Sequence, residues 1–289
     1  MKVTYQLKPP PIDAMEWDSY AIAVEDELQQ LLRSEECAEE KYQHFLELNP
    51  SLLPWGYGTF GGGHHGLIHG AVISQPRLPG LGGYKPDFLY IATDSAAIYA
   101  VLIEIESPCK PWFTQSGQPS SKLTQAMNQL REWKIWFEKP ENETAFRRHY
   151  RVPSGAPFDE RRFLQKYYLI YGRRDDLTKS GRSGQRSMHE GPDEHFVSWD
   201  HLRPSLEYRD TITATLDRSG YRAISVPPTL RLGPHTARQH DSLAKKADVA
   251  TTHPMMQAQR AKFLQSRWPY WDSWASLGNH GLIKSRDWE

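Results

Sequence analysis

Two glutamates stand close together in a stretch of sequence that is otherwise apolar. Glu104 and Glu106 are two residues apart within IYAVLIEIESP, the segment from Ile98 to Pro108. Side chains alternate between the two faces of a strand, so both carboxylates point to the same side. Each ionised carboxylate costs several kcal/mol to desolvate without a cation or hydrogen-bond donors, and adjacent like charges add to that cost. The spacing therefore predicts a positive charge beside them.

A third acid extends this group. Asp87 lies 17 residues before Glu104, on its own predicted strand, with a short turn between the two strands. Hairpin pairing of these strands brings both carboxylates to one end of a sheet. Asp87, Glu104 and Glu106 can then hold one or two Mg²⁺ ions, with the main-chain carbonyl of Ile105 as a further ligand. Ions held in this way draw in a phosphate and acidify a bound water, which suits phosphodiester hydrolysis.

The elements that must position these acids are strands and amphipathic helices. Strands are expected over YKPDFLYIAT, over the Ile98 segment and over Lys166–Gly172. Helices are expected over about Tyr20–Arg33, with Ile22, Leu28, Leu31 and Leu32 buried, over EECAEEKYQHFLELNP, and over Pro119–Glu138, with Leu123, Met127 and Leu130 buried. Glu40 and Glu47 fall on the polar face of the second helix, where we expect solvent exposure rather than contact with a metal.

Phrases along residues 36–210 are similar to those of the Shedu anti-phage defence nucleases. They occur in the order HFLELNPSLLPWG, KPDFLYI, VLIEIESP, LTQAMNQLREW, YYLIYGRRDDL and FVSWDHL. Pro86-Asp87 and Glu104-Ile105-Glu106 also resemble the motif of the larger PD-(D/E)XK nuclease superfamily, to which that family belongs. The resemblance implies an α/β fold with a PD-(D/E)XK restriction-endonuclease-like core, α-β-β-β-α-β, in which helices flank a mixed central sheet.

The same resemblance carries expectations about activity and partners. It implies a Mg²⁺-dependent deoxyribonuclease, with Mn²⁺ as an alternative ion, that cuts or nicks phage DNA. It also implies assembly into homo-oligomers and a role in protecting bacteria from phage. No membrane partner is implied.

Glu106 departs from the superfamily pattern, which has a lysine at this position. A lysine there orients the attacking water and stabilises negative charge in the transition state, which a carboxylate cannot do. Glu106 can instead act as general base or as ligand of a second ion. Alternatively, Lys122 supplies the charge, since it shares a helix face with Gln125 and Gln129 at i, i+3 and i+7. The resemblance implies that these glutamines line the active site, and we hypothesise that Lys122 replaces the missing lysine.

The same departure supports a second class of function. A nuclease-fold module that has lost catalysis, and that binds nucleic acid or a phage protein as a sensor or scaffold, also accounts for Glu106. Metal-dependent nicking of DNA that requires Asp87 and Glu104 separates the enzyme from such a module.

Basic residues beyond the third strand are candidates for contacts with DNA. Arg173 and Arg174 follow that strand, and a flexible loop with Lys179, Arg182 and Arg186 comes next. Guanidinium and ammonium groups contact phosphates in most DNA-binding proteins. A plain surface loop explains the same residues equally well.

Histidines and cysteines do not form a recognisable zinc motif. His64, His65 and His69 lie in or near a glycine-rich connection, without a neighbouring cysteine or an HExxH arrangement, so they are interpreted as polar loop residues. The chain has two cysteines, Cys37 and Cys109, too few for a disulfide framework and consistent with a reducing cytosol.

Charge is balanced overall but segregated along the chain. Lys plus Arg and Asp plus Glu each number 35, whereas Asp13–Glu47 holds 11 acidic and 2 basic residues and Arg147–Arg186 holds 11 basic and 4 acidic ones. Such segregation allows a basic face toward a polyanion, or simply two solvated surfaces. No segment has the length of a signal peptide core or a membrane span, so we expect a soluble, cytoplasmic protein.

The chain is divided by these patterns into three parts. Residues 1–35 are interpreted as an N-terminal helical arm, 36–210 as the nuclease-like domain and 211–289 as a C-terminal extension. The last part ends in an aromatic cluster of Trp268, Tyr270, Trp271 and Trp274. Aromatic residues of this density stack on unpaired bases or bury themselves in a core or subunit interface, and we favour an interface.

Overall fold

The computed structural model describes residues 3–34, 36–55, 66–80, 82–179, 181–182, 184–278 and 287–289. Its helices are α1 (Trp17–Arg33), α2 (Glu39–Leu48), α3 (Ser121–Phe137), α4 (Pro140–His149), α5 (Arg174–Lys179), α6 (Pro234–Gln239) and α7 (Ala258–Ser276). Its strands are β1 (Gly66–Leu67), β2 (Ala71–Ser74), β3 (Phe88–Thr93), β4 (Ala97–Ile105), β5 (Arg162–Ile170), β6 (Glu194–Val197), β7 (Ile212–Asp217) and β8 (Gly220–Ser225).

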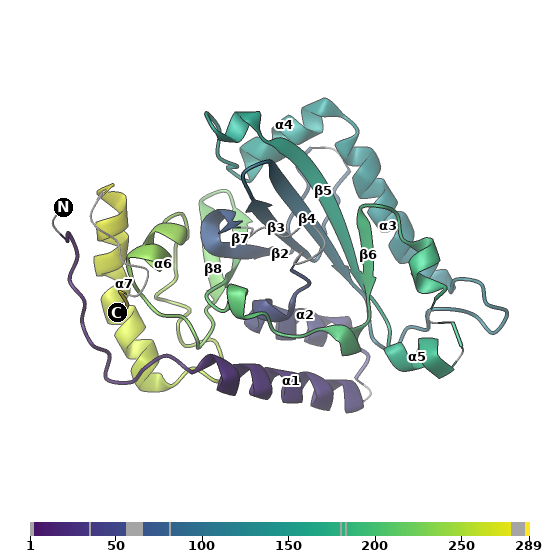
Figure 1. Ribbon diagram of the computed structural model, residues 1–289, viewed down its shortest axis with the longest axis horizontal. Helices are drawn as coiled ribbons and strands as arrows, with labels where there is room; N and C mark the ends of the chain where they lie inside the picture. The colour runs from purple at the N-terminus through teal and green to yellow at the C-terminus, as the bar shows by residue number, and fades with distance from the viewer. Residues whose placement is uncertain are drawn as a thin grey trace.

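The described strands form one mixed sheet. Its order is β6-β5-β4-β3-β2-β7-β8, with β1 beside β3 (Figure 1). The pairs β4–β5, β5–β6 and β2–β7 are parallel, and the remaining pairs are antiparallel. A mixed central sheet flanked by helices is therefore confirmed. Because β7 and β8 belong to this sheet, it continues beyond residue 210, while the predicted division into three parts stays a prediction.

Strand β4 runs through the middle of the core, and all nine of its residues are buried. Its even-numbered side chains Ile98, Ala100 and Leu102 pack in one apolar cluster with α3, α4 and the C-terminal helices. Its odd-numbered side chains pack in a second cluster with α1 and α2. Helices on both faces explain why this strand reads as a continuous apolar run rather than an alternating one. In Figure 1, α1 and α2 lie below the sheet and α3 and α4 at its upper right.

The amphipathic helices lie where the sequence predicts them, with local differences. α1 buries Tyr20, Val24, Leu28 and Leu32, whereas Ile22, expected on the buried side, is 64% exposed. α3 begins after Ser120, whose hydroxyl accepts a hydrogen bond from Leu123 N at 3.0 Å as a helix cap. The basic stretch after β5, expected to be flexible, includes the short helix α5.

The tryptophans near the end of the chain are buried within the protein itself, so the expectation of an interface is wrong for them. Trp268, Trp271 and Trp274 are at most 4% exposed and face the core from α7. The ring of Tyr5, in the extended N-terminal segment, packs against Trp271 and Trp274. This segment runs along α7 in Figure 1, so the two ends of the chain share one apolar cluster.

Cys37 and Cys109 form a disulfide, with their Cα atoms 5.6 Å apart. The cysteine content therefore no longer supports the expectation of a reducing compartment. Within the described part of the chain, no helix has the length and apolar character needed to cross a membrane.

Candidate active site

One edge of the sheet gathers two of the predicted acids. β4 runs antiparallel to β3, so the end of β4 and the start of β3 lie at the same edge. Glu104 is the penultimate residue of β4, and Asp87 directly precedes β3. Asp87 N donates to Ile103 O at 3.1 Å, which extends the pairing of the two strands. The predicted hairpin is confirmed, and it brings the two carboxyl groups together.

Asp87 is held on both of its carboxylate oxygens. Ile105 N donates to Oδ2 at 2.8 Å, and Gln75 Nε2 donates to Oδ1 at 3.0 Å. Gln75 also donates its backbone N–H to Asp87 O at 2.8 Å. The φ of Gln75 is 50°, in the left-handed region that residues other than glycine rarely adopt and that is often found at functional sites. Gln75 thus fixes the orientation of Asp87 through both its backbone and its side chain.

Glu104 is buried between Asp87 and α3. It continues the even-numbered row of β4 that faces α3, which allows Gln129 to hydrogen-bond its carboxyl group. Glu104 is 6% exposed, and its Oε2 is buried without a hydrogen-bond partner. A buried acceptor of this kind is costly unless a donor or a cation meets it.

Burial and mutual repulsion favour a shared proton on this pair. Burial, the largest cause, raises the pKa of Asp87 to about 6. Burial first, and then the charge of Asp87, raises the pKa of Glu104 well above its usual range. The charge of Glu39, at the start of α2, raises the pKa of both acids further. The hydrogen bond between the two carboxyl groups lowers the pKa of Asp87 and raises that of Glu104, so a proton shared by the pair is favoured on Glu104.

Glu106 has a different partner from the other two acids. The Nζ of Lys110 contacts Glu106 Oε2 and lies 3.3 Å from Glu39 Oε2. Lys110 belongs to the turn after β4, where its backbone N–H donates to Ser107 O at 3.1 Å. The positive charge that the sequence predicts beside these glutamates is thus present at Glu106, as a lysine.

The polar face of α2 lines a pocket that opens onto Asp87. The pocket has a volume of about 230 Å³ and is lined by Glu39, Glu40, Gln43, His44, Glu47, Gln75 and Asp87. Glu47 is half-buried and accepts a hydrogen bond from Ser74 at the end of β2. The expectation of solvent exposure is therefore wrong for Glu47, because the last turn of α2 lies against the end of β2. Glu40 is exposed but still lines the pocket.

The polar residues of α3 differ in whether they contact the acids. Gln129 reaches Glu104, whereas Gln125 and Lys122 are exposed and make no hydrogen bond or ion pair with the described acids. The roles of Lys122 and Gln125 stay predictions. Lys110 is the lysine that the structure brings to the acids.

The donor set was compared with what Mg²⁺ requires. Among the described residues, no group of three or more His, Cys, Asp or Glu side chains is arranged to hold a metal ion. Mg²⁺, however, is often bound by one or two carboxylates together with waters and substrate phosphates. Asp87 and Glu104 supply two such carboxylates, and the unpartnered Glu104 Oε2 is a hard oxygen donor. The pair fits Mg²⁺ in this respect, while metal contacts of Glu106 and Ile105 stay predictions.

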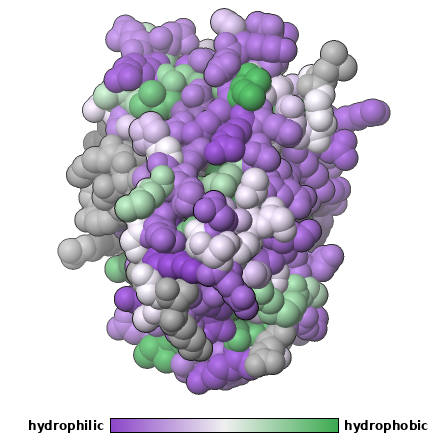
Figure 2. Space-filling model, turned by 90° about the vertical axis from the view of Figure 1, so that its right-hand side faces the viewer, coloured by the Kyte–Doolittle hydropathy of each residue, from purple (hydrophilic) through white to green (hydrophobic). Residues whose placement is uncertain are grey.

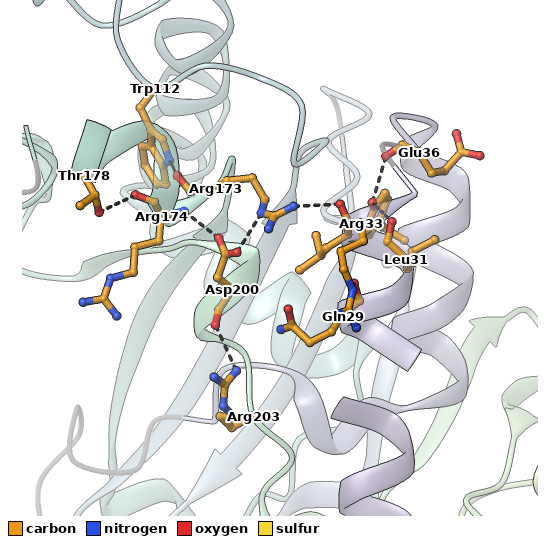
Figure 3. Close-up of polar contacts among 12 residues, drawn as sticks. Gln29, Leu31, Arg33, Glu36, Trp112, Arg173, Arg174, Thr178, Asp200 and Arg203 are labelled. Carbon is orange, nitrogen blue, oxygen red and sulfur yellow. Dashed lines mark hydrogen bonds and ion pairs between the residues drawn. The ribbon is translucent and has the colours of Figure 1, made fainter. Parts of the chain in front are cut away.

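Arg173 and Arg174 lie side by side but differ in their partners (Figure 3). Arg173 Nε donates to Asp200 Oδ1 at 2.8 Å, and its Nη1 donates to Leu32 O at 2.9 Å. Arg174 contacts Asp200 only through its backbone N–H, at 2.7 Å, and its guanidinium points away from these groups in Figure 3. Arg174 is therefore available to a phosphate, whereas Arg173 joins α1 to the start of α5.

The other basic and histidine candidates have structural partners or are not described. Arg182 donates to the backbone carbonyls of Thr114 and Gln115, and Arg186 lies 3.6 Å from Glu190. His69 contacts Tyr150 O and Ser242 Oγ through its two ring nitrogens. His64 and His65 lie outside the described residues, as does the side chain of Lys179. Figure 2 shows the side of the molecule that carries α5 as mainly hydrophilic, with small separate apolar areas.

Three residues of the site were missed from the sequence: Glu39, Gln75 and Lys110. Glu39 belongs to the EE pair at the start of the second predicted helix, where a first-turn acid is explained by the helix dipole alone. No motif in the sequence marks Gln75, because its contacts with Asp87 depend on an unusual backbone conformation. Lys110 follows Glu106 by four residues, and this spacing was the available signal.

Comparisons with known proteins agree with the order of the sequence phrases. A family model described as Shedu protein SduA, C-terminal, matches residues 36–202. No curated protein matches the chain. The matched range begins before α2, ends after β6, and contains the acid pair, Gln129 and Lys110.

Proposed function

The chain belongs to the Shedu family, a membership that suggests anti-phage defence, and on this premise we propose that it is a Mg²⁺-dependent DNA endonuclease or nickase. The observation that carries the proposal is the buried pair Asp87–Glu104, with its raised pKa values and its unpartnered oxygen. The elements α2, β2, β3, β4, α3 and β5 follow one another in the α-β-β-β-α-β sequence expected of a PD-(D/E)XK core, with the short strand β1 and the helix α4 as additional elements between them, and this supports the proposal further.

The residues of the site have distinct parts in the proposed reaction. Bound Mg²⁺ supplies the positive charge that attracts a phosphate oxygen and acidifies a water. Ile105 and Gln75 keep the Asp87 carboxylate pointed at the pocket. Glu104, hydrogen-bonded by Gln129, would hold the ion together with Asp87 in its deprotonated form. Glu47, which lines the same pocket as Asp87, would accept a proton from a water held there.

The cation that a nuclease of this type needs in the transition state has two candidates. Lys110 is next to the acids and held by Glu39 and Glu106. Lys122 is exposed on α3 and remains the hypothesis from the sequence. A Lys122→Ala variant that cleaves at the wild-type rate removes Lys122 from the mechanism.

A plasmid-nicking assay tests the proposal directly. Supercoiled DNA is incubated with wild type, Asp87→Asn or Glu104→Gln in Mg²⁺, Mn²⁺ or EDTA. We expect nicking with either ion, none in EDTA, and a loss on the order of 10²–10³-fold in each variant, as for removal of a charge-stabilising group. Glu132→Gln is the matched control, because Glu132 is an exposed carboxylate on α3.

A catalytically impaired module is the alternative outcome of the same assay. Turnover that is absent under every metal condition, with DNA binding intact by gel shift, contradicts the enzyme and supports a sensor or scaffold. Calorimetry adds an independent readout, since Mg²⁺ uptake that persists in Asp87→Asn contradicts the metal assignment. Light scattering at several protein concentrations tests the expected homo-oligomer.

A further inference from the structure

The disulfide lies at the acid cluster rather than at a distant surface. Cys37 is in the linker between α1 and α2, and Cys109 is in the turn after β4, 72 residues later. Both residues are exposed, so a reductant in solution reaches their sulfurs.

The two segments joined by this bond also carry the ion pairs of Lys110. Glu39 is two residues beyond Cys37, and Lys110 is the residue after Cys109. The Nζ of Lys110 lies 3.3 Å from Glu39 Oε2, across the same gap that the disulfide spans, and contacts Glu106 on its own turn. The covalent bond and the Lys110–Glu39 ion pair therefore hold the same two segments together.

The ion pair alone is a weak tie. The side chains of Lys110 and Glu39 are 26% and 42% exposed, and ion pairs in contact with water contribute little on their own. The turn also depends on local contacts within itself, such as that of Cys109 N with Ser107 Oγ at 3.2 Å, which do not reach α2. Apolar packing keeps α2 itself against β4, so without the disulfide it is the exposed ion pair that must hold the side chain of Lys110 toward Glu39.

We propose that the Cys37–Cys109 disulfide is a redox latch that holds Lys110 between Glu39 and Glu106, and that reduction releases Lys110 and slows cleavage. The part about cleavage rests on the proposed function. The part about the position of Lys110 does not. The cysteines act here as positioning residues, through Lys110.

Opening the latch is a two-electron exchange with a dithiol reductant. A thiolate of the reductant attacks one cysteine sulfur, the Sγ–Sγ bond breaks, and the other cysteine leaves as a thiolate that takes up a proton. The second thiol of the reductant then attacks the mixed disulfide and closes its own disulfide. The first cysteine is released as a thiol, so the protein gains two electrons and two protons.

Chemical labelling tests the latch without reference to catalysis. Oxidised and dithiothreitol-reduced wild type are treated briefly with an acetyl succinimidyl ester, and acetylation is measured by peptide mass spectrometry. We expect Lys110 to react several-fold faster in the reduced protein. Lys122, which is exposed and forms no ion pair with another described residue, is the internal control and should not change. The double variant Cys37→Ser/Cys109→Ser should label like the reduced protein in both buffers, whereas equal Lys110 labelling of oxidised and reduced wild type overturns the proposal.

Nicking rates test the link to Lys110. We expect reduction to slow wild type on the order of tenfold, the scale of losing one charge-stabilising group. Lys110→Ala should be slow in both redox states, and Lys110→Arg should keep a redox response. A disulfide that only stabilises the fold would slow Lys110→Ala on reduction as well, and that result contradicts the latch.

The two assays separate the two proposals. Redox-dependent labelling of Lys110 without nicking in any condition contradicts the proposed nuclease activity and supports the redox latch. Nicking at the same rate in the oxidised and the reduced protein, with unchanged labelling of Lys110, contradicts the redox latch and supports the nuclease activity.

Discussion

At the scale of single residues, the acid pair dominates the site because its two members cannot both be charged at low cost. Asp87 is fixed by Ile105 N and Gln75, and Glu104 is buried beside it. Since both pKa values are raised, the folded protein binds more protons than the unfolded chain between about pH 4 and the folded values. The metal-free protein therefore loses stability as pH rises through about 6.

Replacing Glu104 by glutamine should remove the part of this loss that comes from Glu104. In EDTA we expect Glu104→Gln to be more stable than wild type above pH 6, by on the order of 1–3 kcal/mol, and close to wild type near pH 4. Mg²⁺ at pH 8 should raise the melting temperature of wild type and have little effect on the variant. Thermal unfolding from pH 4 to pH 8 measures both, with Glu132→Gln as control. Parallel pH profiles for wild type and Glu104→Gln would show that the pair shares no proton.

Only part of the site could be predicted at this scale. Asp87 and Glu104 were found because hairpin partners are near in sequence, and their pairing follows from strand alternation. The pairing of Glu106 with Lys110 depends on the shape of a turn, and the approach of Glu39 depends on how α2 packs over the sheet edge. Sequence periodicity describes faces of elements and not distances between elements, so these contacts were beyond its reach.

At the scale of elements, α5 and the turn before it form the best-placed surface for a phosphate. The side chain of Arg174, at the start of α5, has no hydrogen bond or ion pair with the described residues, whereas that of Arg173 holds α1. Replacing Arg174 by alanine should weaken DNA binding and reduce the slope of log affinity against log salt by about 1, because one phosphate contact is lost. Fluorescence anisotropy at several salt concentrations measures this slope.

Arg173→Ala is the matched comparison for Arg174→Ala. It should cost on the order of 1–2 kcal/mol of stability through the lost bonds to Asp200 and Leu32, with a smaller change in salt slope. Urea unfolding measures that loss. An unchanged salt slope in Arg174→Ala would remove α5 from the DNA surface.

Element prediction succeeded where one face of a helix is polar and failed elsewhere. α3 follows the expected bounds within a few residues, since its apolar residues recur at helical spacing. α4 was missed because Pro140 was interpreted as a terminator, whereas proline also suits the first position of a helix. α7 was missed because its buried face includes two arginines, Arg260 and Arg267, and because Pro269 lies within the helix, so the sequence shows no simple apolar stripe.

At the scale of the whole molecule, the continuous sheet connects the candidate nuclease region to the C-terminal part. β7 pairs with β2 in parallel, and the side chains of Ile212 and Ala214 are fully buried. β2 ends at Ser74, which contacts Glu47 in the pocket. The C-terminal part therefore supports a strand that reaches the site.

A chain that ends at Asp210 tests this dependence. We expect it to lack a cooperative thermal transition, because β2 loses its parallel neighbour and the apolar cluster beneath α3 loses α7. Calorimetry and circular dichroism compare it with the full chain. A sharp transition with native-like ellipticity would instead support the predicted boundary at residue 210.

The carboxylate of Asp200 accepts hydrogen bonds from the side chain of Arg173 and from the first amide of α5. The side chain of Arg173 also donates to the carbonyl of Leu32, near the C-terminal end of α1. Three segments distant in sequence thus meet at one junction. The hydrogen bonds of this junction therefore link the position of the acidic N-terminal helix to the start of α5, which carries Arg174, the residue that we predict contacts DNA.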